Sequence, residues 1–523
     1  MKKPMKIFAS LLLLFGLTSC SGPTGTSGNS GNPNASGNSG GSNTSEPGEY
    51  DDVEKAQPKE IQFWHCIGHD KMRNLQRIID KFNEDHSNTD GYYVKAYQIA
   101  GDYDSLHDNV KTKLNSGFVP AISMGYPDSF SEYIGSNGAN NSKILNLDTF
   151  IENDADFHPE TMVQRYYEEG RDYQYDGTWS VPLYKSTEVM YYNIEAFQAT
   201  NVYKNHKDET YGDYDAIIGQ PATWDWDTLI HVCQMIQEEN YQKADFHALG
   251  YDSDANLLIS QMAQRNIPFT TAEGTGAAHF LFMEPDGTNL KPNQDLYDLV
   301  SDLYTMTSST DKKEQCMVTQ ATYGTYASDL FLQEKVMFTV GSTGGSAYNE
   351  PNGKFHAGMV PVPAYQNNRK YIMQGPSLCF FNINDSAKSQ AAWEFYSQYV
   401  SDPELNAGLA LENSYDPVRT ASYESDAYME YTSIGQTDPN TNPYKGTSFS
   451  DSDDVTAELT YRIPNLTKTI QEYYVTTPIF VGSGTARDEI GKVLSYAREE
   501  QGDVAEAIYR AYRQCVISST TSN

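Results

Sequence analysis

Carboxylates are the most abundant side chains in this chain that could do chemistry, with 70 Asp and Glu residues against 37 Lys and Arg. Two suitably placed carboxyl groups can hydrolyse a glycosidic bond by acid and base catalysis. No pair stands out by its spacing, and the sequence from residue 58 onward has no His-Glu-x-x-His, Gly-x-Ser-x-Gly or Walker-type motif. We therefore expect that the chain is not an enzyme, with a secreted carbohydrate-active enzyme as the main rival class.

Polar and aromatic residues that follow predicted strands are better candidates for a functional site than a catalytic carboxylate pair. Such residues could bind a ligand without reacting with it. Residues 60–64, 92–99 and 121–125 have the hydrophobic pattern of strands, and helical patterns over 69–84 and 104–114 separate them. Strands alternating with helices predict a mostly parallel sheet, and ligands bind beyond the carboxyl ends of its strands.

The residues expected at this edge are Trp64, His65, residues 100–103 and Tyr126-Pro127-Asp128. Asp128 could bind a sugar or simply end a turn. Trp64 fits a core position better than a platform for a sugar ring. The edge is therefore a candidate ligand site in which the role of single residues is open.

The rest of the chain continues the same mixed α/β pattern. Helices are predicted over 222–238, 329–335, 386–400, 465–473 and 484–514, and strands over 179–193, 336–340 and 377–382. Asp225 or Thr223 is expected to cap the helix at 222–238. The roughly 465 residues after the N-terminal region are too many for one small core, so we expect two lobes.

The first twenty residues have the layout of a secretory signal. Three lysines precede an apolar run over residues 8–17, which is too short to span a bilayer comfortably. The run ends in Leu17-Thr18-Ser19-Cys20, which resembles a bacterial lipobox, a signal whose Cys thiol receives a lipid. We expect residues 1–19 to be removed and Cys20 to be lipidated. An ordinary signal peptide with a chance cysteine is the alternative.

Residues 20–57 are expected to form a flexible tether. Gly, Ser, Asn, Thr and Pro make up nearly all of residues 21–49, which cannot bury enough surface to offset the entropy of ordering. A coil of this length spans on the order of 30 Å, enough to hold a domain clear of a membrane surface.

Charge and cysteine content exclude several classes of partner. The net charge of −33 argues against nucleic acid or an anionic membrane surface as a partner. Beyond Cys20 there are five cysteines, and none has Cys-x-x-Cys or zinc-site spacing. We expect no metal, no cofactor and no disulfide framework, while pairing among some of the five stays undecided.

Six segments, in chain order, resemble the family 1 extracellular solute-binding proteins of bacterial ABC importers, and among these the sn-glycerol-3-phosphate-binding type. The segments are Phe63-Trp64-His65-Cys66, Gly101-Asp102-Tyr103-Asp104, residues 182–193 (PLYKSTEVMYYN), Gln374-Gly375-Pro376-Ser377-Leu378, residues 413–419 (NSYDPVR) and residues 461–465 (YRIPN). The likeness covers roughly residues 58–515, and residues 182–193 are its most specific part.

The resemblance implies an α/β, two-lobed periplasmic-binding fold of type II, each lobe a mainly parallel sheet flanked by helices. Three crossings between the lobes are expected near residues 184–190, 335–341 and 374–380. The first lobe would then comprise residues 58–184 plus 338–376, and the second 188–336 plus 378–515, with a disordered tail at 516–523. Such a protein closes its lobes over a small solute and delivers it to the permease subunits of the importer.

Carried over by position, the resemblance places ligand contacts at Tyr103, Ser186, Ser342, Gly375, Tyr415 and Arg462. To these we add Asp128 and Asp254 as acceptors for sugar hydroxyls. Either tyrosine could instead be packing, because tyrosine is abundant here, and Arg462 could be held by a nearby carboxylate.

The class of solute follows from a departure from the glycerophosphate type. Where that type has a tryptophan pair, residues 250–256 (GYDSDAN) have carboxylates instead. Together with Asp128 and Glu188 they favour a neutral sugar or oligosaccharide. Arg462 and the turn at residues 341–345 (GSTGG) favour glycerol-3-phosphate or a glycerophosphodiester, which we keep as the alternative.

The expected protein is thus a monomeric, lipid-anchored carbohydrate-binding protein on the outer face of the cytoplasmic membrane. It would work with ABC permease subunits and touch the membrane only through its lipid. An adhesin or structural lipoprotein is a further alternative, which would have no reason to carry the ordered motifs.

Overall fold

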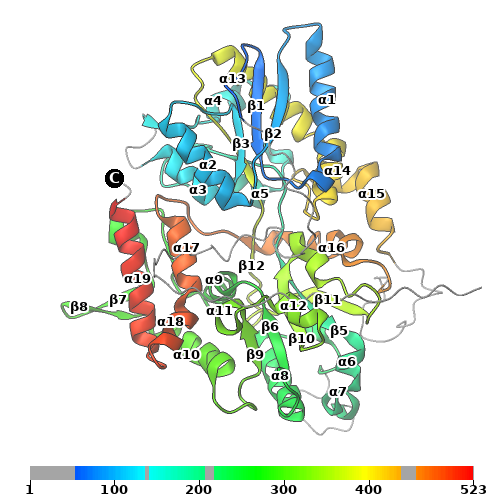
Figure 1. Ribbon diagram of the computed structural model, residues 1–523, viewed down its shortest axis with the longest axis vertical. Helices are drawn as coiled ribbons and strands as arrows, with labels where there is room; N and C mark the ends of the chain where they lie inside the picture. The colour runs from blue at the N-terminus through cyan, green and yellow to red at the C-terminus, as the bar shows by residue number, and fades with distance from the viewer. Residues whose placement is uncertain (1–52, 136–140, 207–216, 437–454, 522–523) are drawn as a thin grey trace, which may run out of the picture. The chain divides into compact units, whose positions relative to one another are not determined.

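The computed structural model describes residues 53–135, 141–206, 217–436 and 455–521. The predicted signal peptide, Cys20 and nearly all of the predicted tether lie outside these residues. The described residues contain two five-stranded mixed sheets with helices packed against them (Figure 1).

The first sheet has the strand order β2-β1-β3-β13-β4. β1 (Glu60–His65) pairs in parallel with β2 (Tyr93–Gln98) and β3 (Ile122–Gly125), whereas β13 (Ser377–Phe380) is antiparallel to β3 and to β4 (Val181–Pro182). We call this sheet and its helices the first lobe. Its main helices are α1 (Arg73–Ser87), α2 (Tyr103–Asn115), α3 (Pro127–Ile134), α13 (Ser386–Glu394) and α14 (Pro403–Glu412).

The second sheet has the strand order β11-β5-β10-β6-β9. β6 (His247–Tyr251) is parallel to β9 (Met317–Thr319) and β10 (Val336–Ser342), whereas β5 (Glu188–Asn193) is antiparallel to β10 and β11 (Ala357–Pro361). We call it, with its helices, the second lobe. Its main helices are α8 (Trp226–Asn240), α9 (Asp254–Arg265), α10 (Gln294–Ser308), α17 (Ser483–Gly491), α18 (Val493–Glu499) and α19 (Val504–Thr521).

Shorter elements complete the described chain. They are η1 (His69–Lys71), α4 (Asp148–Asn153), η3 (Pro159–Thr161), α5 (Gln164–Glu169), α6 (Ile194–Ala199), α7 (Asn201–Asn205), η6 (Pro221–Thr223), η7 (Gly276–His279), β7 (Met283–Asp286), β8 (Asn289–Pro292), α11 (Gln320–Tyr323), α12 (Ala327–Leu332), η8 (Thr343–Asn349), β12 (Tyr371–Ile372), η9 (Phe395–Val400), η10 (Thr420–Glu424), α15 (Asp426–Ser433), α16 (Leu459–Thr467), η11 (Gln471–Tyr473) and β14 (Tyr474–Val475).

Two of the expected segment boundaries differ from the structure. Residues 338–376 were expected in the first lobe, but β10 and β11 pair with β5 and so belong to the second sheet. Conversely, β13, α13 and α14 were expected in the second lobe, but β13 pairs with β3 in the first sheet and the two helices pack with that sheet and with α1. The chain passes from the first lobe to the second at residues 183–187, returns at residues 373–376, and passes to the second lobe again between α14 and α17. The crossing expected near 335–341 is wrong, because the elements on both sides of β10 pack on the second sheet. The sequence pattern of β10, a hydrophobic strand followed by glycines, would be the same in either lobe, so the sequence could not assign this strand to a sheet.

The helix predicted at 465–473 begins earlier, at Leu459. Pro464 lies inside α16 rather than before it. A proline there removes one backbone hydrogen bond, so sequence rules place the helix start after it. The tail at 516–523 was expected to be disordered, but α19 continues the terminal helix to Thr521. Most other expected elements form close to their predicted positions, and Asp225 caps α8 by accepting a hydrogen bond from the Thr228 amide at 2.9 Å.

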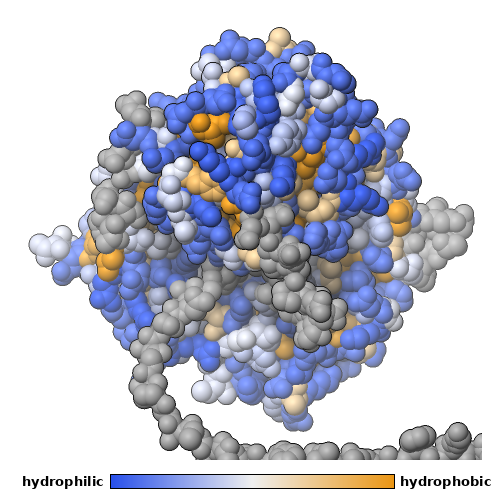
Figure 2. Space-filling model, turned by 45° about the horizontal axis from the view of Figure 1, so that its top comes forward, coloured by the Kyte–Doolittle hydropathy of each residue, from blue (hydrophilic) through white to orange (hydrophobic). Residues whose placement is uncertain are grey.

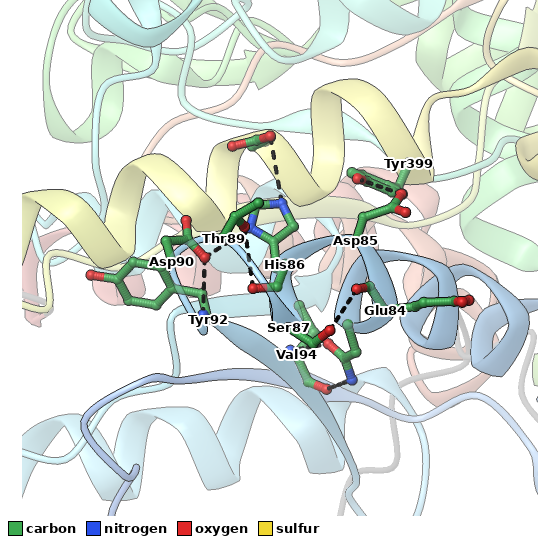
Figure 3. A network of polar contacts seen from close by, with 11 residues as sticks. Glu84, Asp85, His86, Ser87, Thr89, Asp90, Tyr92, Val94 and Tyr399 are labelled. Carbon is green, nitrogen blue, oxygen red and sulfur yellow. Dashed lines mark hydrogen bonds and ion pairs between the residues drawn. The ribbon is translucent and has the colours of Figure 1, made fainter.

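Helix α1 ends in a polar network that fixes the turn into β2 (Figure 3). The His86 ring lies between Asp90 Oδ1 at 3.0 Å and Glu394 Oε1 at 3.5 Å. Asp90 also accepts a hydrogen bond from the Tyr92 amide at 3.1 Å, and Tyr399 donates to Asp85 at 3.0 Å. Because Glu394 and Tyr399 come from α13 and η9, the network ties the first βαβ unit to a segment some 300 residues later.

A buried lysine holds the two crossing segments together. The fully buried ammonium of Lys185 donates to the Glu169 carboxylate, to the Gly375 carbonyl oxygen at 2.9 Å and to Ser377 Oγ at 3.0 Å. Ser186 and Gln374 exchange two backbone hydrogen bonds of 2.9 Å each. The segments 183–187 and 373–376 therefore run side by side as one unit.

A third chain segment joins this unit through Asp416. Its backbone exchanges hydrogen bonds with Lys185 at 3.0 and 2.6 Å. Its carboxyl group accepts from Thr467 Oγ1 at 2.6 Å and from the Tyr474 hydroxyl at 3.4 Å. Burial raises the pKa of Asp416 to about 7, and these hydrogen bonds offset part of the rise. The crossing is thus built from buried polar groups that satisfy one another.

Replacing Lys185 by Met should strongly destabilise the protein. The change leaves the Glu169 carboxyl group buried without its cation, a loss that costs about 3–5 kcal/mol in comparable pairs. The double variant K185M/E169Q should recover part of that loss. The same substitution at Lys81, whose partner Asp85 is exposed, should have little effect. Urea unfolding measures all three, and equal effects of K185M and K81M would contradict the assigned role.

Gly375→Ala should also destabilise the crossing. Gly375 has φ +101°, and a Cβ there would lie 2.8 Å from the Tyr184 carbonyl oxygen and 3.0 Å from Lys185 Cα. Gly353 is the matched control, since it has φ +79° but no atom within 4 Å of the added Cβ. G353A should cost about 1–2 kcal/mol for the left-handed conformation alone. We expect G375A to lower the melting temperature clearly more than G353A; equal shifts would show that the close approach is unimportant.

Candidate ligand-binding site

A cavity of about 240 Å³ lies at the carboxyl edge of the first sheet. Its wall includes residues that directly follow β1 and β2, together with Met124 near the end of β3, and these three are the parallel strands of that sheet. Tyr184 from the first crossing segment, Asn413 and Tyr415 after α14, and Gly344 and Tyr348 from η8 complete it. The cavity therefore takes residues from both lobes and from the crossing between them.

Tyrosine rings form much of the wall. The rings of Tyr184 and Tyr415 lie 4.4 Å apart at 33°, and the hydroxyls of Tyr415 and Tyr103 are 3.5 Å apart. Tyr103 also contacts the Tyr126 ring edge-on, at 4.7 Å between centroids. Such rings offer flat apolar faces with a hydroxyl at the rim, which suit the C–H face and the hydroxyls of a sugar.

Gly344 lets the second lobe reach these rings. A Cβ at this position would lie 2.9 Å from Tyr415 Cζ, closer than side chains pack. The backbone at the start of η8 therefore rests directly on the tyrosine cluster. Only a residue without a side chain fits there.

The charged and amide groups of the wall are few. Asp70, Lys71, Asp102, Gln98 and Asn413 line the cavity. Asp102 is partly engaged, since it caps α2 by accepting from the Ser105 amide at 3.0 Å and the Ser105 hydroxyl at 2.9 Å. Two carboxylates face one ammonium, so the wall has no excess of positive charge. Cys66 also lines the cavity, and burial raises the pKa of its thiol to about 12.

Ser186 and Ser342 are two of the predicted ligand contacts. Each lies two positions along the sequence from a residue of the cavity wall, Tyr184 and Gly344 respectively. Their hydroxyl oxygens are buried and have no hydrogen-bond partner among the described residues, and the same holds for Gln374 Nε2. An unpartnered buried polar group is costly. Such groups are suited to a polar ligand or to bridging water, but neither serine lines the wall of the cavity, so their role as ligand contacts stays a prediction. Gly375, at the same crossing, acts through the close approach described above.

Asp128 and Asp254 lie away from the cavity wall. Asp128, in the first turn of α3, accepts a hydrogen bond of 2.5 Å from Ser483 Oγ in α17, and thus joins the two lobes. Asp254, at the start of α9, is buried and accepts from the Ala321 amide at 2.9 Å. Burial raises the pKa of Asp254 to about 6. Both carboxyl groups therefore have structural partners.

Arg462 also lies outside the cavity wall. Its side chain is 2 % exposed, and its Nη1 donates to the Ala357 carbonyl oxygen in β11 at 2.8 Å. The guanidinium therefore holds α16 against the second sheet. In the sequence analysis Arg462 was the main reason to consider an anionic ligand, and its place outside the wall weakens that reason.

Glu188, which favoured a sugar in the sequence reading, is buried at the edge of the second sheet. It accepts hydrogen bonds from the Tyr251 hydroxyl at 2.6 Å and from Asn256 Nδ2 at 2.7 Å. Burial raises its pKa to about 7, and both hydrogen bonds offset part of that rise. It positions β6 and α9 and does not line the cavity.

The predicted site residues did not include several residues of the wall, namely Cys66, Asp70, Lys71, Tyr184, Tyr348 and Asn413, whereas Gly344 lies in the turn that was singled out. Most lie one to six residues from a position singled out from the sequence. The rule that ligands bind beyond parallel strands indicated the edge at which this cavity lies, whereas the length of each loop decides which side chain turns inward. Trp64, considered as a platform, is fully buried in the core.

The described residues contain no group of three or more His, Cys, Asp or Glu residues that could hold a metal ion. None of their helices is long and apolar enough to cross a membrane. On the face seen in Figure 2, hydrophobic residues form small separate areas among hydrophilic ones.

Comparison with known proteins identifies the family. The profile of bacterial extracellular solute-binding proteins matches residues 77–436. The sn-glycerol-3-phosphate-binding periplasmic protein UgpB of Yersinia pseudotuberculosis is 25% identical over 382 residues, which are 70% of this chain and 75% of that protein. UgpB of Pectobacterium atrosepticum is 25% identical over 380 residues, covering 70% and 74%.

Solved structures show the same fold. UgpB from Mycobacterium tuberculosis in complex with glycerophosphocholine has a TM-score of 0.61 at 14% identity, covering 88% of this chain and 98% of that one. The cyclic alpha-maltosyl-1,6-maltose binding protein from Arthrobacter globiformis has a TM-score of 0.60 at 16% identity, covering 89% and 100%. These likenesses confirm the predicted two-lobed, type II fold. The chain belongs to the family of bacterial extracellular solute-binding proteins.

Proposed function

We propose that the chain is the solute-binding subunit of an ABC importer and that the cavity beside Tyr415 binds a neutral carbohydrate. The composition of the wall carries this proposal, since it combines tyrosine faces with Asp70 and Asp102 and has Lys71 as its one cation among the described residues. Carboxylates accept hydrogen bonds from sugar hydroxyls and repel phosphate. The volume of about 240 Å³ suits one or two sugar rings better than a long oligosaccharide.

A glycerophosphodiester is the second candidate. It is supported by the UgpB relatives and by Lys71, which could pair with a phosphate. Against it stand the two carboxylates of the wall and the engagement of Arg462 in the second lobe. Membership of a family that binds solutes supports a binding role in preference to catalysis.

The proposed mode of action is closure of the lobes over the solute. The cavity takes Gly344 and Tyr348 from the second lobe and its other walls from the first lobe and the crossing. A ligand that contacts both lobes favours the closed form by the difference in its affinity for the two forms. The closed form would then be recognised by the permease subunits.

We also retain the proposed placement of the protein as a monomer at the outer face of the cytoplasmic membrane. Cys20 would carry the lipid, and the Gly/Ser/Asn-rich tether would give the two lobes freedom to reach the permease. The family to which the chain belongs is extracellular, which agrees with this placement.

The ligand class can be tested with Tyr348→Ala and Lys71→Gln after a thermal-shift screen of sugars and glycerophosphodiesters. A ligand at 100 times its Kd should add about 2.7 kcal/mol of stability. Y348A should weaken a sugar about 2- to 12-fold by calorimetry, because one ring contact is lost. K71Q should leave sugar affinity nearly unchanged but weaken a phosphodiester about tenfold or more.

Tyr297→Ala is the matched control, because Tyr297 is a similarly exposed tyrosine in α10, away from the cavity. It should leave affinity unchanged. A phosphodiester that binds tightly and loses affinity in K71Q would reverse our choice of carbohydrate. A ligand whose affinity neither Y348A nor K71Q changes would place the site elsewhere.

Lipid anchoring is tested by Cys20→Ser in cells. The variant should lose partition into the detergent phase, because no thiol is left to receive the lipid, and its signal should stay uncut or be miscut. Cys66→Ser serves as the control for a general effect of cysteine loss and should partition like the unchanged protein. A C20S variant that still enters the detergent phase would exclude the proposed anchor.

A further inference from the structure

A second cavity, of about 640 Å³, lies beside the β12–β14 strand pair and shares no residue with the candidate ligand site. Its wall combines α5 and the loop that follows it with the ends of β12 and β14. β12 and β14 pair in parallel, Tyr371 with Tyr474 and Ile372 with Val475. β12 leads directly into the second crossing segment, so the cavity lies against the joint between the lobes.

The side chains on the wall of this cavity have a net positive charge, whereas the whole protein is negative. Arg165, Arg171, Arg369 and Lys370 line it, together with the carboxylates of Glu168, Asp172 and Glu472. Cations thus outnumber anions on its wall, whereas the whole chain has 70 acidic and 37 basic residues. A local excess of positive charge on so acidic a chain is unexpected for a surface that only has to be soluble.

Three of the four cations are available to a ligand. Arg165 is paired with Glu168 at 3.2 Å. Arg171, Arg369 and Lys370 form no ion pair with the residues that the structure describes. The Arg369 guanidinium lies over the Tyr473 ring, 5.6 Å from its centroid, which limits the positions that it can take.

The cations come from both sides of the joint. Arg171 follows α5 of the first lobe, whereas Arg369 and Lys370 end the segment that leaves β11 of the second sheet. An anion with several oxygens could therefore be bound from two directions at once. Guanidinium groups suit this role, since each presents a planar set of donors to phosphate oxygens.

We propose that this cavity is a second site, which binds a small anion bearing phosphate groups. Phosphate fits better than a single carboxylate, because three cations need more than one pair of acceptor oxygens. The same chemistry could come from a free phosphate compound or from a lipid headgroup. The concave wall favours the free compound, since the strongly negative chain is repelled by an anionic bilayer.

Pyrophosphate is a suitable probe in calorimetry with the full folded chain at two salt concentrations. The unchanged protein should bind it, and Arg171→Gln and Arg369→Gln should each weaken binding about tenfold or more, as loss of a hydrogen bond to a charged group requires. Arg77→Gln is the matched control, because Arg77 is an exposed arginine of α1 that lines neither cavity. Its affinity should change less than twofold.

Three outcomes would overturn the proposal. The first is absence of pyrophosphate binding at low salt. The second is an equal loss in R77Q, which would indicate non-specific attraction to surface charge. The third is binding to phosphatidylglycerol vesicles, lost in R171Q, without binding of pyrophosphate, which would assign the cavity to a lipid surface. Arg171 and Arg369 are both exposed, so either variant should fold, and circular dichroism confirms this.

Discussion

The buried ammonium of Lys185 is the interaction on which the rest of the molecule depends. It donates hydrogen bonds to Glu169, Gly375 and Ser377 at once. Lys185 lies where the chain leaves the first sheet, and Gly375 lies where the chain returns to it. Burying a charge is costly unless it is paired and hydrogen-bonded, so this arrangement allows little variation in the backbone around it. The two crossing segments are thereby fixed to each other at one point between the lobes.

The candidate ligand site is a consequence of that fixed point. Tyr184 precedes Lys185 and is packed against Tyr415, whose neighbour Asp416 is hydrogen-bonded to the Lys185 backbone. The tyrosine faces are thus set by the crossing, while the loops after β1 and β2 supply the polar groups. The rings would be positioned by the crossing, and the polar groups of the loops would select among solutes of similar size.

The sequence predicted the mixed α/β class, most elements and the correct edge of the first sheet, because hydrophobic period and strand–helix alternation are local signals. It predicted Tyr103 and Tyr415 in the cavity wall through family resemblance. It misplaced β10, β11 and β13, since a hydrophobic strand does not record which sheet it joins. It also could not foresee that Arg462 faces the Ala357 carbonyl oxygen, because that contact joins residues 105 positions apart.

The hydrogen-bonded carboxyl groups of Glu188 and Asp416 each contribute an uptake of protons to the folding of this chain. Each has its pKa raised to about 7 by burial, whereas in the unfolded chain it would ionise near pH 4. Between these values the folded form binds more protons than the unfolded form, so its stability falls as pH rises through that window and levels off above it. These two carboxyl groups are thus among the least acidic of a strongly negative protein, and their contribution to stability is larger in mild acid than at neutral pH.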